Sequence, residues 1–361
     1  MKIFSIFFLS MFLLSPRAAE PPYYQSASSS GRGGSLVSSA DGRMSCFYNP
    51  AGLNLFEDHL NLSVNGGFGL SSSIIGLATF AGENLKGFED KSKLDSGFFK
   101  SAEEVENVWN YAAPYTDMTL NTKNFGVGFF WQPDIQFMLE SGGFIPLIGT
   151  SINSDIMVTA SAAKRLLKSV SGGITLKYMY VSRMSPSILS TPETINLAEE
   201  LGENLGSTET LEKFIETKQG MGFDAGLIFH SGLIKTGAVF RDIFSVLDGK
   251  TVRMKLDLGT TWHVPYLIEK APVKDFTVYL DFLDIFGPGS KTKSFHTGAE
   301  AAFRNFVFRT GLNQGYPVFG FSLMLGIFHF DYAFFQKETG IYAGQKPDIS
   351  HTFGGGLDIA F

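Results

Sequence analysis

The chain has 361 residues and a formal net charge of −6, and 44% of it is hydrophobic, with 36 phenylalanines, 12 tyrosines and 40 glycines. This acidic balance leaves no basic stripe for a phosphate backbone, so we expect no nucleic-acid partner. A single cysteine, Cys46, excludes an intrachain disulfide and a cysteine metal cluster, and we expect it to be a small buried residue.

The first residues have the pattern of an export signal. An apolar run over residues 3–15 follows Lys2 and is too short to cross a bilayer as a helix, but it has the length of a signal-peptide core. Pro16 and the small residues up to Ala19 supply the break expected near a cleavage site. We therefore expect residues 1–19 to be a signal peptide and the rest of the chain to be exported.

A segment rich in serine, glycine and alanine follows. Residues 26–53 are too polar to cross lipid, and their small side chains allow a compact plug inside a lumen. Asn49, Pro50, Ala51 and Gly52 form a turn signature that could attach such a plug to a surrounding wall. The sequence thus predicts a hatch over residues 20–58.

The remainder of the chain alternates between apolar and polar side chains. Beyond the signal region no stretch has the 18 continuous apolar residues of a membrane helix, so the many aromatic residues fit strands that alternate lipid and lumen faces. The predicted strands are residues 59–81, 122–132, 134–140, 153–165, 168–182, 220–230, 233–242, 252–264, 273–283, 293–304, 305–314, 317–326, 327–336 and 350–361. Charges on the opposite faces indicate a polar lumen: Lys255, Asp257, Asp281, Glu300 and Arg309.

These strands must close, because backbone groups in lipid have no water to pair with. We expect an all-β fold, a 14-stranded antiparallel transmembrane β-barrel over residues 59–361 in the bacterial outer membrane, with an N-terminal hatch and short helices in long extracellular loops. Fourteen strands put both ends of the barrel on the periplasmic side. The predicted inner turns are residues 132–134, 164–168, 231–232, 304–305 and the region of Gly326, with a longer inner connection at 265–272; the predicted outer loops are 82–121, 183–219, 243–251, 284–292 and 337–349.

Two outer loops carry apolar residues at helical spacing. Residues 101–111 predict one short amphipathic helix and residues 191–218 a pair broken near Gly206. Their apolar faces either pack onto the barrel rim or form a capture surface for hydrophobic ligands. The candidate ligand contacts are Phe88, Phe98, Phe99, Trp109, Leu197, Leu201 and Phe214.

The last predicted strand ends on an aromatic ring. Phe353, Leu357, Ile359 and Phe361 share one face of that strand, which predicts a lipid-facing row. We interpret these four residues as a membrane-insertion signal, with outer-membrane lipids and the barrel-assembly machinery as partners.

A family resemblance adds to these predictions. The stretch Phe47 to Leu53, F-Y-N-P-A-G-L, its place before the first strand, the strand parity and the aromatic C-terminus together resemble the FadL family of outer-membrane transporters for long-chain fatty acids and other hydrophobic compounds. The resemblance implies a hatch seated by Asn49, Pro50 and Ala51, passive capture of a hydrophobic small molecule such as a fatty acid at the outer loops, and exit through a gap in the wall after the hatch moves. This chain is shorter than the larger members, so the substrate does not carry over.

Other functions remain open. The six histidines occur singly, and no H-E-x-x-H pair or G-x-S-x-G elbow is present, so we expect no enzyme, no catalytic or metal-binding residues and no cofactor. His296 has the nearest thing to a catalytic context, although a lone strand histidine is usually structural. A general porin would need an open lumen, which the small-residue segment opposes. A scaffold or secretion-associated barrel without hydrophobic-ligand transport is the other alternative.

Overall fold

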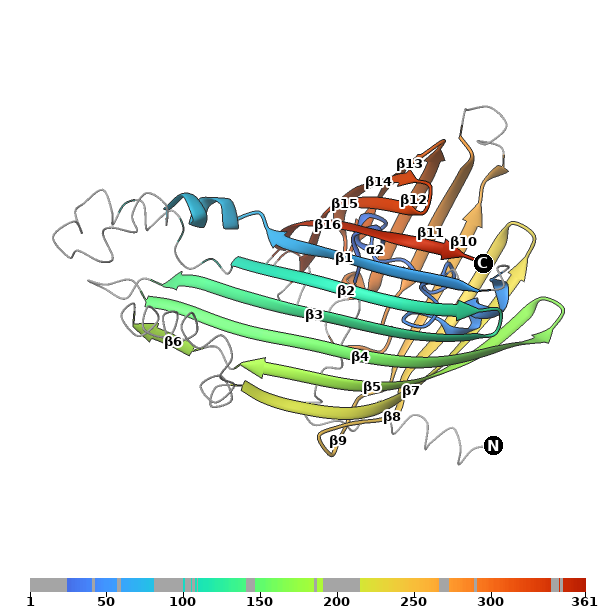
Figure 1. Cartoon of the computed structure of the whole chain (residues 1–361), viewed down its shortest axis with the longest axis horizontal. Coiled ribbons are helices and arrows are strands. Elements are labelled where there is room, and N and C mark those ends of the chain that lie inside the picture. The colour runs from blue at the N-terminus through green and yellow to red at the C-terminus, as the bar shows by residue number, and fades with distance from the viewer. Residues whose placement is uncertain are drawn as a thin grey trace.

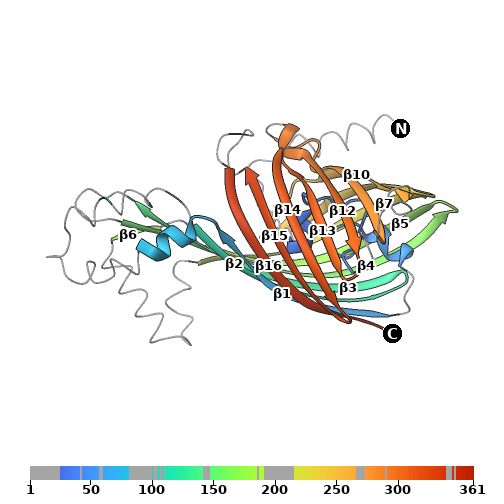
Figure 2. The ribbon, with the colours of Figure 1, turned by 90° about the horizontal axis from the view of Figure 1, so that it is seen from above.

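The computed structural model describes residues 25–40, 43–56, 60–80, 110–140, 147–184, 187–190, 215–265, 273–288, 291–338 and 347–361, together with residues 100, 105, 108 and 344. Fourteen antiparallel strands form a closed barrel, in which each strand pairs with its neighbours in the chain and the pairings of β1 with β16 and of β8 with β10 complete the circle (Figures 1 and 2). The predicted fold class is confirmed.

The barrel strands are β1 (Asn61–Ser71), β2 (Asn110–Thr122), β3 (Phe125–Glu140), β4 (Leu147–Leu167), β5 (Val170–Met184), β7 (Ile215–Ser231), β8 (Ile234–Leu247), β10 (Lys255–His263), β11 (Asp275–Phe282), β12 (Phe295–Phe303), β13 (Phe306–Asn313), β14 (Tyr316–Leu325), β15 (Phe328–Glu338) and β16 (Pro347–Ala360). Two short strands pair at the margins, β6 (Ser187–Ser190) with β4 and β9 (Lys250–Thr251) with β8. Short helices are α2 (Ala27–Gly31), η1 (Pro50–Leu55) and η3 (Lys291–Ser294). No helix among the described residues has the length and apolarity needed to span a bilayer.

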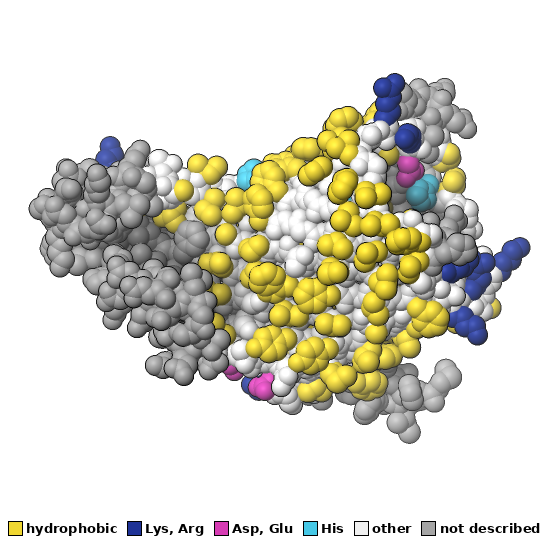
Figure 3. Space-filling model, in the orientation of Figure 1, with side chains coloured by type: hydrophobic (Ala, Val, Ile, Leu, Met, Phe, Trp, Pro, Cys, Tyr) yellow, Lys and Arg dark blue, Asp and Glu magenta, His cyan; other side chains and the backbone are white. Residues whose placement is uncertain are grey.

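The outer surface of the barrel is apolar because strand side chains alternate between two faces. On β13 and β14, for example, Phe306, Phe308, Phe319 and Phe321 are all exposed, while Arg309 between them points inward and is largely covered. Hydrophobic side chains spread across the face of the wall shown in Figure 3, and charged ones lie at its edges. This is the construction of a bacterial outer-membrane barrel, and the predicted location is confirmed.

The two ends of the barrel differ in their connections. At the end where Phe361 lies, adjacent strands are joined by two-residue turns such as Lys123-Asn124, Gly232-Leu233 and Arg304-Asn305. Asn124 and Arg304 adopt positive φ angles there, of 82° and 49°, as tight hairpins require. The long connections leave the opposite end, and β3 and β4 extend furthest toward it (Figure 1). We refer to the short-turn end as the inner end and to the other as the outer end.

Several of the predicted elements are wrong although the total of fourteen is right. Of the predicted strand 59–81 only Asn61–Ser71 form β1, and residues 74–80 are helical. Residues 122–132 and 134–140 are one strand, β3, so the predicted inner turn at residues 132–134 lies within it. The missing strand is β2, in a stretch that the sequence assigned to an outer loop. Its first residues, Asn110 and Tyr111, were predicted to end a helix, and residues 215–218, predicted to be helical, begin β7.

Candidate functional site: the plugged lumen

The lumen of the barrel is occupied by the N-terminal part of the chain. We call residues 25–40 and 43–56 the luminal segment; α2 and η1 belong to it and lie within the barrel (Figure 1). Nearly all its side chains are buried, although many are serines and glycines. Because the segment is too short for a core of its own, its burial comes from the barrel wall that surrounds it.

Local capping interactions fold this segment. Ser26 caps α2 by accepting a hydrogen bond from the Ser29 backbone N–H, and the Ser29 hydroxyl contacts the Ser26 backbone N–H in return, which forms a capping box. Asn49 caps η1 in the same way, since its Oδ1 accepts the Ala51 N–H at 3.1 Å and Pro50 occupies the first helical position.

The motif Asn49-Pro50-Ala51-Gly52 lies at the centre of this packing. Asn49 is fully buried, and its Nδ2 donates to the Val37 carbonyl oxygen at 2.7 Å and to the Leu227 carbonyl oxygen of β7 at 3.4 Å. A Cβ at Gly52 would overlap the Ala40 carbonyl oxygen, so only glycine fits there. The four residues therefore join the luminal segment to itself and to the wall.

Glycines on the inner face of the wall allow this close approach. At each of them an added Cβ would come within 3.0 Å of an atom of the luminal segment, closer than real Cβ atoms come to their neighbours. These wall glycines are Gly126, Gly128, Gly173, Gly226, Gly237, Gly259, Gly298 and Gly320. They come from seven strands, so the plug contacts most of the barrel circumference.

Wall side chains also bond the backbone of the luminal segment. Asp281 accepts the N–H groups of Leu36 and Val37 at 2.6 and 2.9 Å. Arg241 donates to the carbonyl oxygens of Phe47 and Tyr48, each at 3.1 Å. Charge-assisted bonds of this kind are the stronger ones, and they satisfy backbone groups that the lumen hides from water.

His296 has a structural contact of the same kind. Its Nδ1 lies 2.7 Å from the Gly33 carbonyl oxygen, and the ring is buried. Among the described residues, no three His, Cys, Asp or Glu side chains lie close enough together to hold a metal ion.

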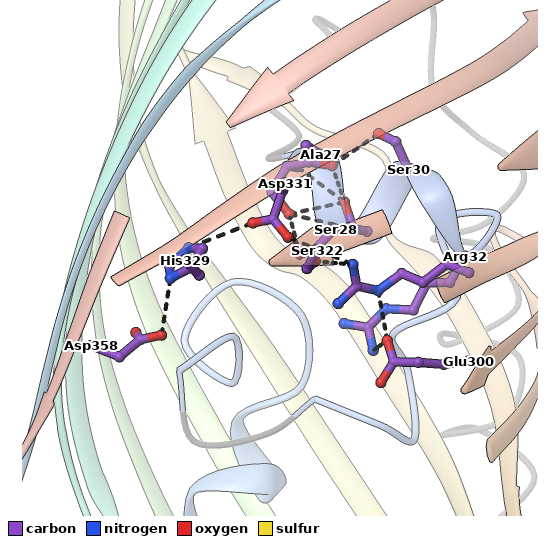
Figure 4. Close-up of polar contacts among 12 residues, drawn as sticks. Ala27, Ser28, Ser30, Arg32, Glu300, Ser322, His329, Asp331 and Asp358 are labelled. Carbon is purple, nitrogen blue, oxygen red and sulfur yellow. Dashed lines mark hydrogen bonds and ion pairs between the residues drawn. The ribbon is translucent and has the colours of Figure 1, made fainter. Parts of the chain in front are cut away.

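A chain of ion pairs links the luminal segment to strands β12 to β16 (Figure 4). Arg32 lies 3.9 Å from Glu300, which binds Arg309 at 2.6 Å. Arg309 is 3.6 Å from Asp331, which lies 3.5 Å from His329. Asp358 contacts His329 at 3.3 Å and closes the chain by binding Arg43 at 2.6 Å. Both arginines of the luminal segment thus pair with wall carboxylates, so displacement of the segment would separate these charges.

Cys46 lies against the wall and is buried, as predicted. Its Sγ is 3.1 Å from Oδ1 of Asn121 on β2. Burial raises the pKa of the Cys46 thiol to about 12 because the thiolate would lose its hydration. Desolvation likewise raises the pKa of Tyr48 to about 12.

A small cavity lies on the outer side of α2. It has a volume of about 90 Å³ and is bounded by Gln25 and Ser30 of the luminal segment and by side chains of β1, β2, β3, β15 and β16. Tyr111, Tyr115 and Phe335 contribute its aromatic surface. The Tyr115 hydroxyl accepts the Ala27 N–H at 3.4 Å, so the cavity wall and the start of α2 are in direct contact.

The hydrogen-bond ladder between β2 and β3 is interrupted beside this cavity, although both strands continue side by side. In the β2–β3 ladder Ala112 pairs with Ile135 and Thr116 with Trp131, and the three residue pairs between them are absent. Pro114 and Pro133 face each other at the centre of the break. Since proline has no N–H to donate, neither strand can restore the ladder there. Gln132 and Asp134 of this stretch line the cavity on the inner side.

The predicted site residues fall into four groups. The motif residues of the hatch are in the lumen as described above. The predicted lumen charges Asp257, Asp281, Glu300 and Arg309 do face inward. The terminal row faces outward: Phe353 is exposed and stacks on Phe68 with ring centroids 5.1 Å apart, and Phe361 is also exposed. All seven candidate ligand contacts lie outside the described residues: Phe88, Phe98, Phe99, Trp109, Leu197, Leu201 and Phe214.

Sequence reasoning missed the cavity, the interrupted ladder and the wall glycines. Pro114 and Pro133 were visible signals, since proline within a strand marks an edge or an interruption. The glycines were visible too, because Gly126, Gly226 and Gly298 lie on the face of their strands that alternates with the apolar face. Their function depends on which residue of the luminal segment lies against them. The alternation of apolar and polar residues along a strand does not predict that contact.

Comparison with known proteins supports the fold. No family model and no curated protein matched the chain. Among solved structures, a deletion mutant of the TodX monoaromatic hydrocarbon channel has a TM-score of 0.56 at 10% identity, covering 93% of this chain and 98% of its own. The Pseudomonas putida toluene transporter TodX has a TM-score of 0.53 at 10% identity, with 95% and 99% covered, and the Ralstonia pickettii toluene transporter TbuX 0.52 at 10%, with 93% and 98% covered. The resemblance found in the sequence is confirmed at the level of fold.

Proposed function

We propose that this barrel mediates passive uptake of hydrophobic or amphipathic small molecules across the outer membrane. The observation that carries the proposal is the luminal segment, which lies inside the barrel with nearly all of its described residues buried. A general porin needs an open aqueous lumen instead. The solved barrels of the same fold named above are channels for toluene and monoaromatic hydrocarbons, which favours the same class of cargo here.

The route has three proposed parts. Ligands are captured at the outer loops that carry the seven candidate contacts, including Trp109 and Phe214. They pass to the cavity on the outer side of α2, and they leave through the wall near Pro114 and Pro133 once the luminal segment moves. In this scheme residues 1–19 are a signal peptide, residues 20–58 act as the hatch and residues 59–361 form the barrel.

The proposed uptake needs no external energy source. An alkyl chain gains roughly 0.8 kcal/mol for each CH₂ that it transfers from water to an apolar site, so capture is spontaneous. Release requires only that the hatch shift between two arrangements of similar free energy. A long-chain fatty acid is one candidate cargo, and a hydrocarbon is another.

The test combines uptake with conductance. Cells that express the protein in an outer membrane lacking its own hydrocarbon channel should take up radiolabelled toluene several-fold faster than cells with an empty vector, and the purified protein should show no large steady conductance in planar bilayers. Large steady channels would instead identify a porin. Absence of both uptake and conductance would favour a scaffold or secretion role.

A further inference from the structure

The cavity beside α2 contains two hydrogen-bond acceptors without partners. Oε1 of Gln132 and Oδ1 of Asp134 are each buried and make no hydrogen bond, although both residues line the cavity. The other oxygen of Asp134 accepts the Gln136 side-chain amide at 2.5 Å, so the carboxylate is held in place. A buried acceptor without a donor costs free energy, and a donor placed in the cavity would recover that cost.

The charge of the cavity lining determines which donor groups it favours. Asp134 is its only ionisable carboxylate, and the described side chains that line it include no lysine, arginine or histidine. Arg183 lies two strands away on β5 and is bound to Asp155 of β4. An ammonium or hydroxyl group would therefore be favoured beside Asp134, and a carboxylate would be repelled.

The apolar part of the lining is aromatic. The hydroxyl of Tyr111 donates to Ser350, and that of Tyr115 accepts the Ala27 N–H. Because both hydroxyls have partners elsewhere, the two rings and Phe335 offer mainly apolar surface to the cavity. Aromatic rings also stabilise a neighbouring cation.

The volume limits what can fit. A dry cavity of about 150 Å³ holds a benzene molecule, whereas this one has about 90 Å³. A head group of a few heavy atoms fits, and a whole hydrophobic ligand does not. The attached tail must therefore extend beyond the cavity, and the interrupted stretch of the β2–β3 ladder adjoins it, since Gln132 and Asp134 belong to both.

We propose that this cavity receives the hydrogen-bond-donating head of an amphipathic ligand, a primary ammonium or a hydroxyl, and discriminates against carboxylates. The inference rests on the proposed uptake function and concerns only its amphipathic cargo, in which it favours amines and alcohols over carboxylates; a hydrocarbon such as toluene has no head group for this site. Gln132 and Asp134 are the specificity-determining residues, and the aromatic rings of Tyr111 and Tyr115 surround the head group.

Binding of three short probes tests this inference. Hexylamine, hexanol and hexanoate have the same apolar tail and partition weakly into lipid, so equilibrium dialysis against the full-length protein in nanodiscs, with empty nanodiscs subtracted, compares their head groups. We expect hexylamine and hexanol to bind at least about tenfold more tightly than hexanoate at pH 7, which corresponds to one hydrogen bond to a charged group.

Two opposite substitutions locate the effect. Asp134→Asn should weaken hexylamine about tenfold and leave hexanol within about twofold, whereas Gln132→Glu should strengthen hexylamine. Should Asp134→Asn fail to fold, Gln132→Glu still decides the matter. Glu216→Gln removes an equal charge from an exposed position on β7, where Glu216 pairs with Lys218, and should change nothing.

The outcomes separate the two proposals. Equal affinities for the three probes, or affinities that neither cavity variant changes, would mean that the cavity holds ordered water only and would overturn the inference. Toluene uptake by cells, measured in parallel, reports on transport itself. Normal toluene uptake with equal probe affinities would reject the head-group site alone, whereas an amine preference without any uptake would reject the transport function and leave the site.

Discussion

The side-chain amide of Asn49 donates a 2.7 Å hydrogen bond to the carbonyl oxygen of Val37, which ties together two parts of the luminal segment that are twelve residues apart. The same side chain accepts the Ala51 N–H and donates to Leu227 of the wall. One buried residue thus holds the fold of the plug and its attachment to the barrel.

Asn49→Ala removes all three hydrogen bonds and should cost about 1–3 kcal/mol in the free energy of seating the segment. We expect intermittent conductance in planar bilayers, because the plug then leaves its position part of the time. Asn49→Asp keeps the acceptor for Ala51 but places a buried carboxylate oxygen against the carbonyl oxygens of Val37 and Leu227, so it should be at least as disruptive. If the Asn49→Ala barrel showed no more conductance than the wild type, that result would contradict this role.

Arg241 should matter for two separable reasons. It pairs with buried Asp257 and donates to the carbonyl oxygens of Phe47 and Tyr48. Arg241→Leu leaves Asp257 buried without its cation and should destabilise the barrel by about 3–5 kcal/mol in urea unfolding. Adding Asp257→Asn should recover part of that stability, because no unpaired charge is then buried. It does not restore the bonds from Arg241 to the luminal segment, so both the single and the double variant should conduct.

Arg183 provides the matched control for this prediction. It pairs with Asp155 across β4 and β5 at a partly exposed position. Arg183→Leu should cost less than about 1 kcal/mol and leave conductance unchanged. Equal effects of the Arg183 and Arg241 variants would show that the luminal contacts of Arg241 are unimportant.

Cys46 should report the position of the luminal segment. With a pKa of about 12 and almost no exposed surface, only about one thiol in ten thousand is ionised at pH 8, against about one in four for an ordinary thiol. We expect wild-type protein to resist maleimide and Asn49→Ala to react at least tenfold faster, measured as a mass shift. Rapid labelling of the wild type would show that the segment is not seated as described.

The interruption in the β2–β3 ladder gives a prediction about transport. Replacing both Pro114 and Pro133 by valine restores two N–H donors, so the β2–β3 ladder can close and gain about 0.5–1.5 kcal/mol for each new hydrogen bond. Uptake of toluene should fall several-fold while stability rises. Pro317→Val on β14, where the ladder with β13 is continuous, is the control and should leave uptake unchanged. Undiminished uptake by the double variant would place the exit elsewhere.

The barrel was predictable because alternation is a local property of the sequence. Alternate residues such as Phe319 and Phe321 lie on the same face of a strand, and in the structure both are exposed on the outer surface of the barrel. Strand β2 escaped detection because its outward row, which includes Ala112, Pro114 and Thr116, is weakly apolar, and because Val105 and Val108 just before it have helical spacing. Pro133 was misinterpreted as a turn because proline is rare inside strands, and its neighbours in the chain do not show that the ladder with β2 is interrupted at this position.

The site was only partly predictable. The composition of residues 26–53 predicted a plug, and Asn49 was identified correctly as part of its attachment. The partners of the plug were not, since Arg241, Asp281 and Gly226 are separated from it by about two hundred residues and meet it only once the barrel has closed. The unpartnered acceptors of Gln132 and Asp134 are likewise a property of packing, not of sequence pattern.

The central claim is that the luminal segment must move for cargo to pass, and one substitution tests it directly. A Cβ added at Gly126 would lie 2.6 Å from Sγ of Cys46, so a cysteine there is adjacent to Cys46, and the other crowded atoms are the ends of the Asn121 and Leu53 side chains, which can shift. Gly126→Cys should therefore lock the segment to β3 on oxidation, and Gly126→Ser is the control of equal shape. We predict that toluene uptake by the oxidised Gly126→Cys protein is lost and returns on reduction, while the serine variant ignores the redox state; full uptake with the disulfide verified by mass spectrometry would contradict the account.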